Sequence, residues 1–334
     1  MNMKPYTYYT CIKAILPLLC LGMCGCSTED NSLPSGGDIT LSRTALCVSG
    51  KIDFPSSARV SDSSWERGDR IGIFMVETGK APIATYIVGD AFNRNYAYYG
   101  TDGVFSPSAA TDTIWFPQDV AQKVDFIAYY PYTQSVDSDN PSLSINLSAS
   151  QTDYLYAARV SGCDRTKPAV SFSFAHLLGR VEVELIAGGG MDASALSGAR
   201  VSLSGVPVSA TCSLVDGSLA IDGNSSGTLP LAGNSTLVLP SSGAGRSLVI
   251  SLPGVDEALS WELPSDKFFR AGESTVYHIT LKTKAEEVPD DPVEPDDPDT
   301  PDDPAPDPQI ELSVTSQVVD WIPGNGDGES GSAD

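Results

Sequence analysis

The sequence has little of the chemistry that enzymes use. Its 334 residues include two histidines, His176 and His278, and both lie among apolar residues of expected strands rather than beside a nucleophile. The glycine clusters at 188–190 and 243–245 lack the lysine and the spacing of a phosphate-binding loop. We therefore expect no catalytic residue and no cofactor, and we interpret the chain as a protein that is not an enzyme.

Metal-binding and disulfide patterns are also missing. A loop that opens at Asp137 in the manner of a calcium site has Ser142 where the glycine is required. Beyond the leader described below, the cysteines Cys47, Cys163 and Cys212 are odd in number and widely spaced. We expect no metal site and no disulfide framework, and we interpret these three residues as buried thiols.

Positive charge is scarce. Twenty Lys and Arg stand against 43 Asp and Glu, which gives a net charge of −23, so nothing here would neutralise the phosphates of a nucleic acid. The acidity is uneven, because 16 acidic residues and no Lys or Arg follow Lys284. Nucleic acid is therefore excluded as a partner, and the charge belongs mainly to one segment.

No apolar run is long enough for a transmembrane helix. Ala14–Gly25 is a run of 12 residues preceded by Lys4 and Lys13, which predicts a signal peptide over residues 1–25. Cys26 follows the small Gly25 and is the favoured site of lipid attachment, by palmitate or a related acyl chain, although Cys24 competes. The acidic stretch that follows resembles the surface-export signal of Bacteroidetes lipoproteins, so we expect a lipidated tether over 26–38 in the outer membrane of a Gram-negative bacterium.

Helical periodicity is absent from the mature chain, whereas short alternating segments rich in aromatic and β-branched residues recur between Gly, Pro, Asp and Asn. This pattern predicts an all-β fold with two domains, over residues 39–167 and 168–285. The expected strands are Arg70–Val76, Tyr96–Tyr99, Thr113–Phe116, Val124–Tyr130, Leu143–Leu147, Tyr154–Ala158, Val170–His176, Val181–Leu185, Arg200–Leu203, Cys212–Val215, Ser218–Ile221, Thr236–Leu239, Ser247–Leu252, Trp261–Leu263 and Thr275–Leu281.

Two local features refine this expectation. Apolar residues occupy even positions from Val170 to His176 and odd positions from Val181 to Leu185, which predicts a bend or bulge over 177–179. Asp216-Gly217 between two strand candidates predicts a two-residue hairpin turn.

The C-terminal part contains a spacer and an isolated strand. Residues 286–308 are almost entirely proline and acid, which predicts a stiff, extended, solvated linker. Within the segment 309–334, Ile310, Leu312, Val314 and Trp321 form an apolar strand that cannot be stable alone and must add to a sheet, its own or that of another molecule.

Several motifs occur in a specific order. Trp65–Met75 reads W-x-x-G-D-x-I-G-I-F-M and resembles a signature of the fimbrillin family. Gly68-Asp69 makes a turn, the apolar residues alternate into a core, and Gly72 lets another group approach closely. The further matching pieces are Asn95-Tyr96, Ile114–Pro117, Val124–Tyr132, Gln151–Ala157, Phe172–Leu178 and Val319–Trp321.

The resemblance implies two tandem β-sandwich domains of transthyretin-like, Greek-key type in a lipoprotein that builds a surface pilus, or fimbrium. Members are cut after an arginine near the N-terminus, which removes the first strand and opens a groove for a strand of a neighbouring subunit. Here the arginine candidates are Arg59 and Arg43, with ordinary surface arginines as the alternative. The implied partners are other pilus subunits or further copies of the chain, outer-membrane lipid through Cys26, and a host protein or glycan.

A surface glycan-binding lipoprotein is the competing interpretation. Tyrosines are frequent near 96–99 and 129–132, and an exposed row of them would offer a platform for sugars, although core positions are the commoner use of such residues. The long acidic spacer departs from the family pattern and leaves a stalk, anchor or tip role open.

Overall fold

The computed structural model describes residues 42–53, 65–100, 103–283 and 310–320. Within these ranges the chain is built of β-strands and three short 3-10 helices, η1 (Ala84–Tyr86), η2 (Ala110–Asp112) and η3 (Ala193–Leu196), which confirms the all-β fold. No helix in the described ranges has the length and apolar character needed to cross a membrane.

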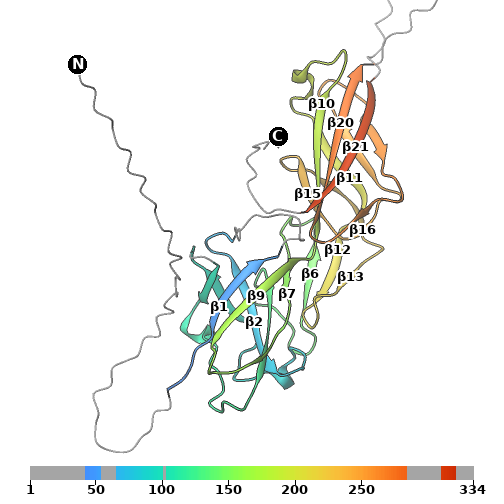
Figure 1. The fold of residues 1–334 in the computed structure, drawn as a ribbon. Helices are drawn as coiled ribbons and strands as arrows, with labels where there is room; N and C mark the ends of the chain where they lie inside the picture. Colours follow the sequence, from blue (N-terminus) through green and yellow to red (C-terminus); the bar gives the residue numbers. More distant parts are fainter. Residues whose placement is uncertain (1–41, 54–64, 101–102, 284–309, 321–334) are drawn as a thin grey trace, which may run out of the picture. The chain divides into compact units, whose positions relative to one another are not determined.

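Strands of the first half form a closed circuit, of which Figure 1 labels β1, β2, β7 and β9. The hydrogen-bonded order is β2-β3-β4-β1-β9-β7-β5, and β5 pairs again with β2. An eighth strand, β8, pairs with β5. The bounds are β1 (Cys47–Ile52), β2 (Arg70–Glu77), β3 (Arg94–Tyr98), β4 (Val104–Pro107), β5 (Val124–Tyr130), β7 (Leu155–Ala157), β8 (Val160–Cys163) and β9 (Ala169–His176).

The strands β2 and β5 are buried on both faces because each lies between two cores. Ile71, Ile73 and Met75 point into the core enclosed by the circuit, while Phe74 and Val76 belong to a second core shared with later strands. Burial on both sides explains why the sequence of β2, RIGIFMVE, is almost continuously apolar rather than alternating.

The second half contains two four-stranded sheets, one two-stranded sheet, and two strands of a three-stranded sheet that β6 completes. One sheet has the order β15-β10-β20-β21 and the other β14-β11-β17-β18. The bounds are β10 (Gly179–Ala187), β11 (Arg200–Pro207), β14 (Ser226–Pro230), β15 (Ser235–Val238), β17 (Ser247–Ser251), β18 (Leu259–Glu262), β20 (Glu273–Thr283) and β21 (Ile310–Asp320), with β16 (Ser241–Ser242) paired to β19 (Phe268–Phe269).

The two halves share strands and core. β6 (Ser142–Asn146) lies early in the chain but pairs with β12 (Ser209–Ser213), which in turn pairs with β13 (Leu219–Ile221). Leu143 and Ile145 of β6 are buried in the second core. The second core, formed mainly by strands that follow residue 178, is therefore completed by residues of β6, far earlier in the sequence.

The structure corrects the expected domain division and one expected strand. The division expected at residue 167 does not separate the sheets, because β9, which follows it, pairs with β1 and β7, and β6, which precedes it, pairs with β12. The change of parity between β9 and β10 falls after His176, as expected for a bend. The segment 113–116 forms an isolated bridge, Ala45↔Trp115, rather than a strand.

The turn at Asp216-Gly217 is also longer than predicted. β12 ends at Ser213 and β13 begins at Leu219, so residues 214–218 connect them. Gly217 has a positive φ of 76°, while Asp216 accepts hydrogen bonds from the backbone N–H and the hydroxyl of Ser218, at 3.1 and 2.7 Å. The aspartate therefore stabilises the loop through its side chain.

Candidate functional site

The first strand, β1, is an interior member of the circuit. It pairs in parallel with β9 over six residues, from Cys47↔Ala169 to Ile52↔Phe174, and antiparallel with β4 through Val48↔Phe105 and Ser49↔Val104. Figure 1 shows β1 and β9 side by side. Removing β1 would leave two unpaired strand edges and an opened core, which makes this position a candidate acceptor groove.

Every second residue of this segment faces the enclosed core. Leu46, Val48 and Ile52 are 5%, 3% and 7% exposed, and Gly50 between them is also buried. Burying a large aliphatic side chain contributes about 1.5–3 kcal/mol. β1 is thus held by a hydrogen-bonded ladder on each side, by its side chains Val48 and Ile52, and by Leu46 immediately before it.

The position of Gly50 is tightly enclosed. A Cβ placed there would lie 3.0 Å from Cε2 of Phe174 and 3.1 Å from Cε2 of Phe105. Contacts of this length require the neighbouring rings to move by a few tenths of an ångström. The groove therefore has room for large residues at three inward positions and for a very small one at the fourth.

Trp65 also contacts β1 at Gly50. Its indole N–H donates a buried hydrogen bond of 2.9 Å to the carbonyl of Gly50. Its ring meets those of Phe105, Phe174 and Tyr130 edge to face, at centroid distances of 5.0, 5.2 and 5.6 Å. The first residue of the Trp65 motif is therefore part of the wall that holds β1.

The two candidate arginines differ in their relation to β1. Arg43 is exposed, precedes β1, and has its guanidinium 4.4 Å from the centre of the Trp115 ring. Arg59 lies outside the described residues, in the segment between β1 and Trp65. A cut after Arg43 would leave β1 joined to Trp65, whereas a cut after Arg59 would detach it. Cys26 and Trp321 also lie outside the described residues.

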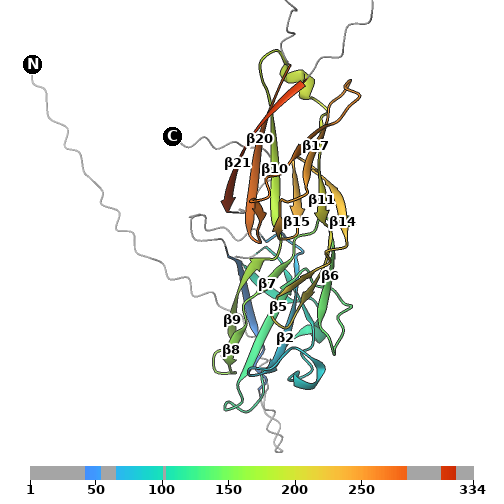
Figure 2. The ribbon, with the colours of Figure 1, turned by 90° about the vertical axis from the view of Figure 1, so that its right-hand side faces the viewer.

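The expected C-terminal strand is β21, and it is paired within the chain. It runs antiparallel to β20 from Glu273↔Asp320 to Thr283↔Ile310, and Figure 2 shows β10, β20 and β21 side by side. Ile310, Leu312 and Val314 are partly buried against the second core. The structure thus brings these three predicted residues together on one face.

β21 is held less firmly than β1. It is the last strand of its sheet, with a partner on one side among the described residues. None of its described side chains is fully buried, and Val318 and Val319 are 50% and 40% exposed. An edge strand with half-buried or exposed side chains and, among the described residues, one hydrogen-bonded neighbour is suited to leave its sheet.

The tyrosines proposed as a sugar platform are mostly core residues. Tyr96, Tyr98 and Tyr129 are buried, while Tyr99 is 50% exposed. Burial raises the pKa of Tyr96 to about 12, and the nearby Asp112 adds to this rise, against a hydrogen bond from the Ile114 N–H to the tyrosine hydroxyl. These rings stabilise the circuit and do not form an exposed row.

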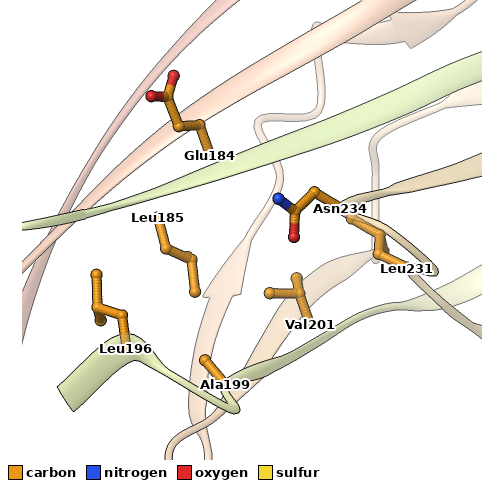
Figure 3. A pocket seen from close by; sticks show the side chains of 7 residues that line it. All are labelled: Glu184, Leu185, Leu196, Ala199, Val201, Leu231 and Asn234. Carbon is orange, nitrogen blue, oxygen red and sulfur yellow. The ribbon is translucent and has the colours of Figure 1, made fainter. Parts of the chain in front are cut away.

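A pocket of about 230 Å³ opens between β10, η3 and β11 (Figure 3). The side chains of Leu185, Val201 and Asn234 point into it, and Glu184 points away. The Glu184 carboxylate lies 2.8 Å from Nδ1 of His278, its partner on the neighbouring strand. The pocket walls named here carry no aromatic ring for a sugar and no paired acid and base.

The second histidine also pairs with a carboxylate. Nδ1 of the buried His176 lies 2.8 Å from Oδ2 of Asp153. In the part of the chain that the structure describes, no three His, Cys, Asp or Glu side chains are grouped to hold a metal ion. His278 therefore links β20 to β10 through Glu184, and His176 links β9 to the segment that precedes β7 through Asp153.

Comparison with known proteins identifies the family. A sequence profile described as fimbrillin-like matches residues 58–295. The chain belongs to the fimbrillin-like family. This confirms the resemblance inferred from the Trp65 motif and the pieces that follow it.

Similar proteins carry consistent descriptions. The fimbrillin-like chain is 30% identical to a Bacteroides uniformis protein named "Putative fimbrium subunit Fim1C", over 97% of this chain and 98% of that protein. A crystal structure of a "putative cell adhesion protein" from Bacteroides uniformis is 30% identical and has a TM-score of 0.64 over 84% of this chain and 99% of that one. One from Bacteroides ovatus, at 18% identity, has a similar fold with a TM-score of 0.58 over 85% and 100%.

Sequence analysis of the fimbrillin-like chain did not identify β1 as a strand. Gly50 interrupts the alternation of Leu46, Val48 and Ile52, and the partner strand β9 lies far along the chain. The sequence nevertheless carries a strand signal here, because three of the four alternate positions from 46 to 52 hold a large aliphatic residue and the fourth holds Gly50.

Proposed function

We propose that this chain is a structural or accessory subunit of a cell-surface fimbrium and that it assembles by strand exchange. The observation that carries the proposal is the contrast between two strands. β1 fills an interior place in a closed circuit and precedes a candidate cleavage site, whereas β21 is a half-buried edge strand. Membership in the fimbrillin-like family supports the same role.

In this proposal, cleavage after Arg59 detaches β1 from Trp65 and the rest of the chain. The empty place then exposes the backbone edges of β4 and β9 and the apolar core that Val48 and Ile52 had covered. Each large side chain returned to water costs about 1.5–3 kcal/mol, so an incoming strand is strongly favoured. Main-chain hydrogen bonds would supply affinity and alternate side chains would fill the vacated sites.

The incoming strand is β21 of a neighbouring copy or subunit. While it pairs with its own β20, its high effective concentration keeps it there and prevents early assembly. Lipid attachment at Cys26 places the precursor at the outer membrane, and cleavage releases the body from that anchor. The acidic spacer 286–308 gives β21 the reach to enter another molecule.

The proposal is tested on cells of the source bacterium that produce the wild-type chain or no chain. Wild-type cells are expected to carry filaments that antibody against the chain labels in electron micrographs, and cells without the chain are expected to lose them. The Arg59→Ala chain should accumulate as an uncut, membrane-bound precursor, while the matched Arg43→Ala chain should assemble normally. Unaltered filaments in cells without the chain would contradict a structural role, and normal assembly of Arg59→Ala would exclude Arg59 as the site.

A further inference from the structure

The segment 46–52, which includes β1, and the segment 312–318 of β21 share one pattern of large, small and polar residues. Residues 46–52 read LCVSGKI and residues 312–318 read LSVTSQV. Both have large aliphatic residues at the first, third and seventh positions, a small residue at the fifth, and small or polar residues between. We propose that β21 of one copy replaces β1 of the next in a single register, with Leu312 at the place of Leu46 and Ser316 at the place of Gly50. This inference rests on the proposed strand exchange.

The face that β21 would insert is set by its alternation. Its even-numbered residues Ile310, Leu312 and Val314 pack on the core in the present structure, Ser316 continues this face half-buried, and Val318 at its end is 50% exposed. The intervening odd-numbered residues from Glu311 to Gln317 are exposed. Only Ser316 is small on the apolar face. The strand therefore carries one inward residue that suits a narrow site.

The narrow site selects the register. A Cβ at Gly50 already lies 3.0–3.1 Å from the rings of Phe174 and Phe105, so a serine fits after a small movement of those rings and a valine does not. Sliding β21 by two residues in either direction puts Val314 or Val318 at this place. A shift of one residue turns the polar face inward.

The direction of insertion is also determined. In the proposed register β21 runs as β1 does, parallel to β9 and antiparallel to β4. With the reverse direction and Ser316 still at the Gly50 place, Asp320 would stand at the buried place of Leu46. An unpaired carboxylate is costly in an apolar site. The order of large, small and charged residues thus favours one direction as well as one register.

Hydrogen bonds made by the β1 backbone would be reproduced. The Trp65 indole N–H, which bonds to the carbonyl of Gly50, would bond to that of Ser316, and the Gly103 carbonyl, which accepts from Gly50 N at 2.8 Å, would accept from Ser316 N. Trp65 remains with the cleaved chain because it follows Arg59. The buried indole therefore needs a replacement carbonyl at this place.

Disulfide trapping measures the register. Ser49 and Val104 are antiparallel partners, and Val104 is 40% exposed, so Thr315, at the Ser49 place, should lie opposite Val104 of the next copy at a distance that a disulfide can bridge. Lipid-free chains from Ser27 onward carry Thr315→Cys in the donor copy and Val104→Cys in the acceptor copy, and both are cut after Arg59. Cys163→Ala removes a half-buried native thiol, while Cys212 is fully buried.

The expected result is a covalent dimer of donor and acceptor on non-reducing gels. Matched donors with Ser313→Cys or Gln317→Cys should yield at most about a tenth of it, because their side chains lie one cross-strand pair away. The proposed register is wrong if a matched donor gives more disulfide-linked dimer than Thr315→Cys does. It is also wrong if no donor gives the covalent dimer while oligomers still form. In both cases strand exchange itself is not contradicted. If the parent chain forms no oligomers after cleavage, the proposed function fails with the inference.

A second pair of variants tests the role of Ser316. Ser316→Leu should slow or weaken oligomer formation by at least about tenfold through overpacking, while Gln317→Leu, which adds the same side chain on the exposed face, should assemble as the parent does. In the uncut chain Ser316 is half-buried opposite Tyr277 at the sheet edge, so the precursor should fold in both variants. Assembly of Ser316→Leu at the parental rate would overturn the selection at Gly50.

Discussion

Replacing Gly72 by alanine is expected to destabilise the body strongly. Gly72 lies in the middle of β2, opposite Tyr129 of β5 and Asn95 of β3. A Cβ there would lie 2.2 Å from Cε1 and 2.5 Å from Cζ of Tyr129, and 2.8 Å from Oδ1 of Asn93. The ring of Tyr129 must therefore move for an alanine to fit.

The ring is not free to move. Tyr129 is fully buried in the second core, its hydroxyl donates a 2.7 Å hydrogen bond to Oδ1 of Asn93, and its ring stacks on that of Phe74 at a centroid distance of 6.0 Å. Burial raises the pKa of its hydroxyl above the usual range, as expected for a phenol held neutral in the interior. Displacing the ring would strain the packing and break that hydrogen bond.

Overpacking costs about 1–3 kcal/mol and loss of the hydrogen bond about 0.5–1.5 kcal/mol. The opposing gain from a less flexible unfolded chain is about 0.4–1 kcal/mol. These contributions combine to a loss of about 0.5–4 kcal/mol, centred near 2, so we expect Gly72→Ala to lower the free energy of unfolding by about 2 kcal/mol and the melting temperature by about 4–8 °C. Thermal and urea unfolding followed by circular dichroism measure both quantities.

Two further variants make the test specific. Gly223→Ala, at a turn where a Cβ meets nothing within 4 Å, should change stability by less than about 0.5 kcal/mol. In a Tyr129→Leu background the smaller side chain should remove most of the cost of Gly72→Ala. A Gly72→Ala chain as stable as the wild type, or an equal cost in both backgrounds, would refute the reasoning.

Three further predictions concern charge, anchoring and the spacer. Burial opposes ionisation of Asp125, but the backbone N–H groups of Gly79 and Gly162 and the Arg159 guanidinium outweigh this effect and hold the pKa of Asp125 below its usual range. The ionised carboxylate therefore stabilises the folded state above pH ~4, and this contribution is lost as the pH falls through the lower folded pKa. Asp125→Asn should cost about 2–4 kcal/mol at pH 7 and make the stability depend less steeply on pH in the acid range. Cys26→Ala should abolish lipid labelling and membrane retention, and persistent labelling would point to Cys24. Deleting 286–308 should leave the melting temperature of the body nearly unchanged, and a large loss would mean that the spacer packs against it.

Strands were predicted best where the signal lies within the strand's own sequence. β5 was expected with the observed bounds, and β2 and β9 within one residue, because their apolar runs are dense and bounded by turn residues. The close approach expected at Gly72 is confirmed, and the approaching group is the ring of Tyr129.

Features that depend on distant partners were not predictable in this way. β1 was missed because Gly50 breaks its pattern, and the narrowness that explains Gly50 comes from Phe105 and Phe174 on other strands. The pairing of β6 with β12 could not be predicted either, because the residues of Ser142–Asn146 do not indicate which distant strand is their hydrogen-bonding partner.

The oligomeric state of the cleaved chain, with and without residues 309–334, tests strand exchange most directly. The uncut chain should be monomeric, and the chain cut after Arg59 should form a ladder of SDS-resistant oligomers, because a strand inserted into a closed circuit is lost only when the acceptor unfolds. The truncated chain should be cut equally well and remain monomeric. Equal ladders from the truncated and full-length chains would contradict the account, because β21 would then not be the donor strand.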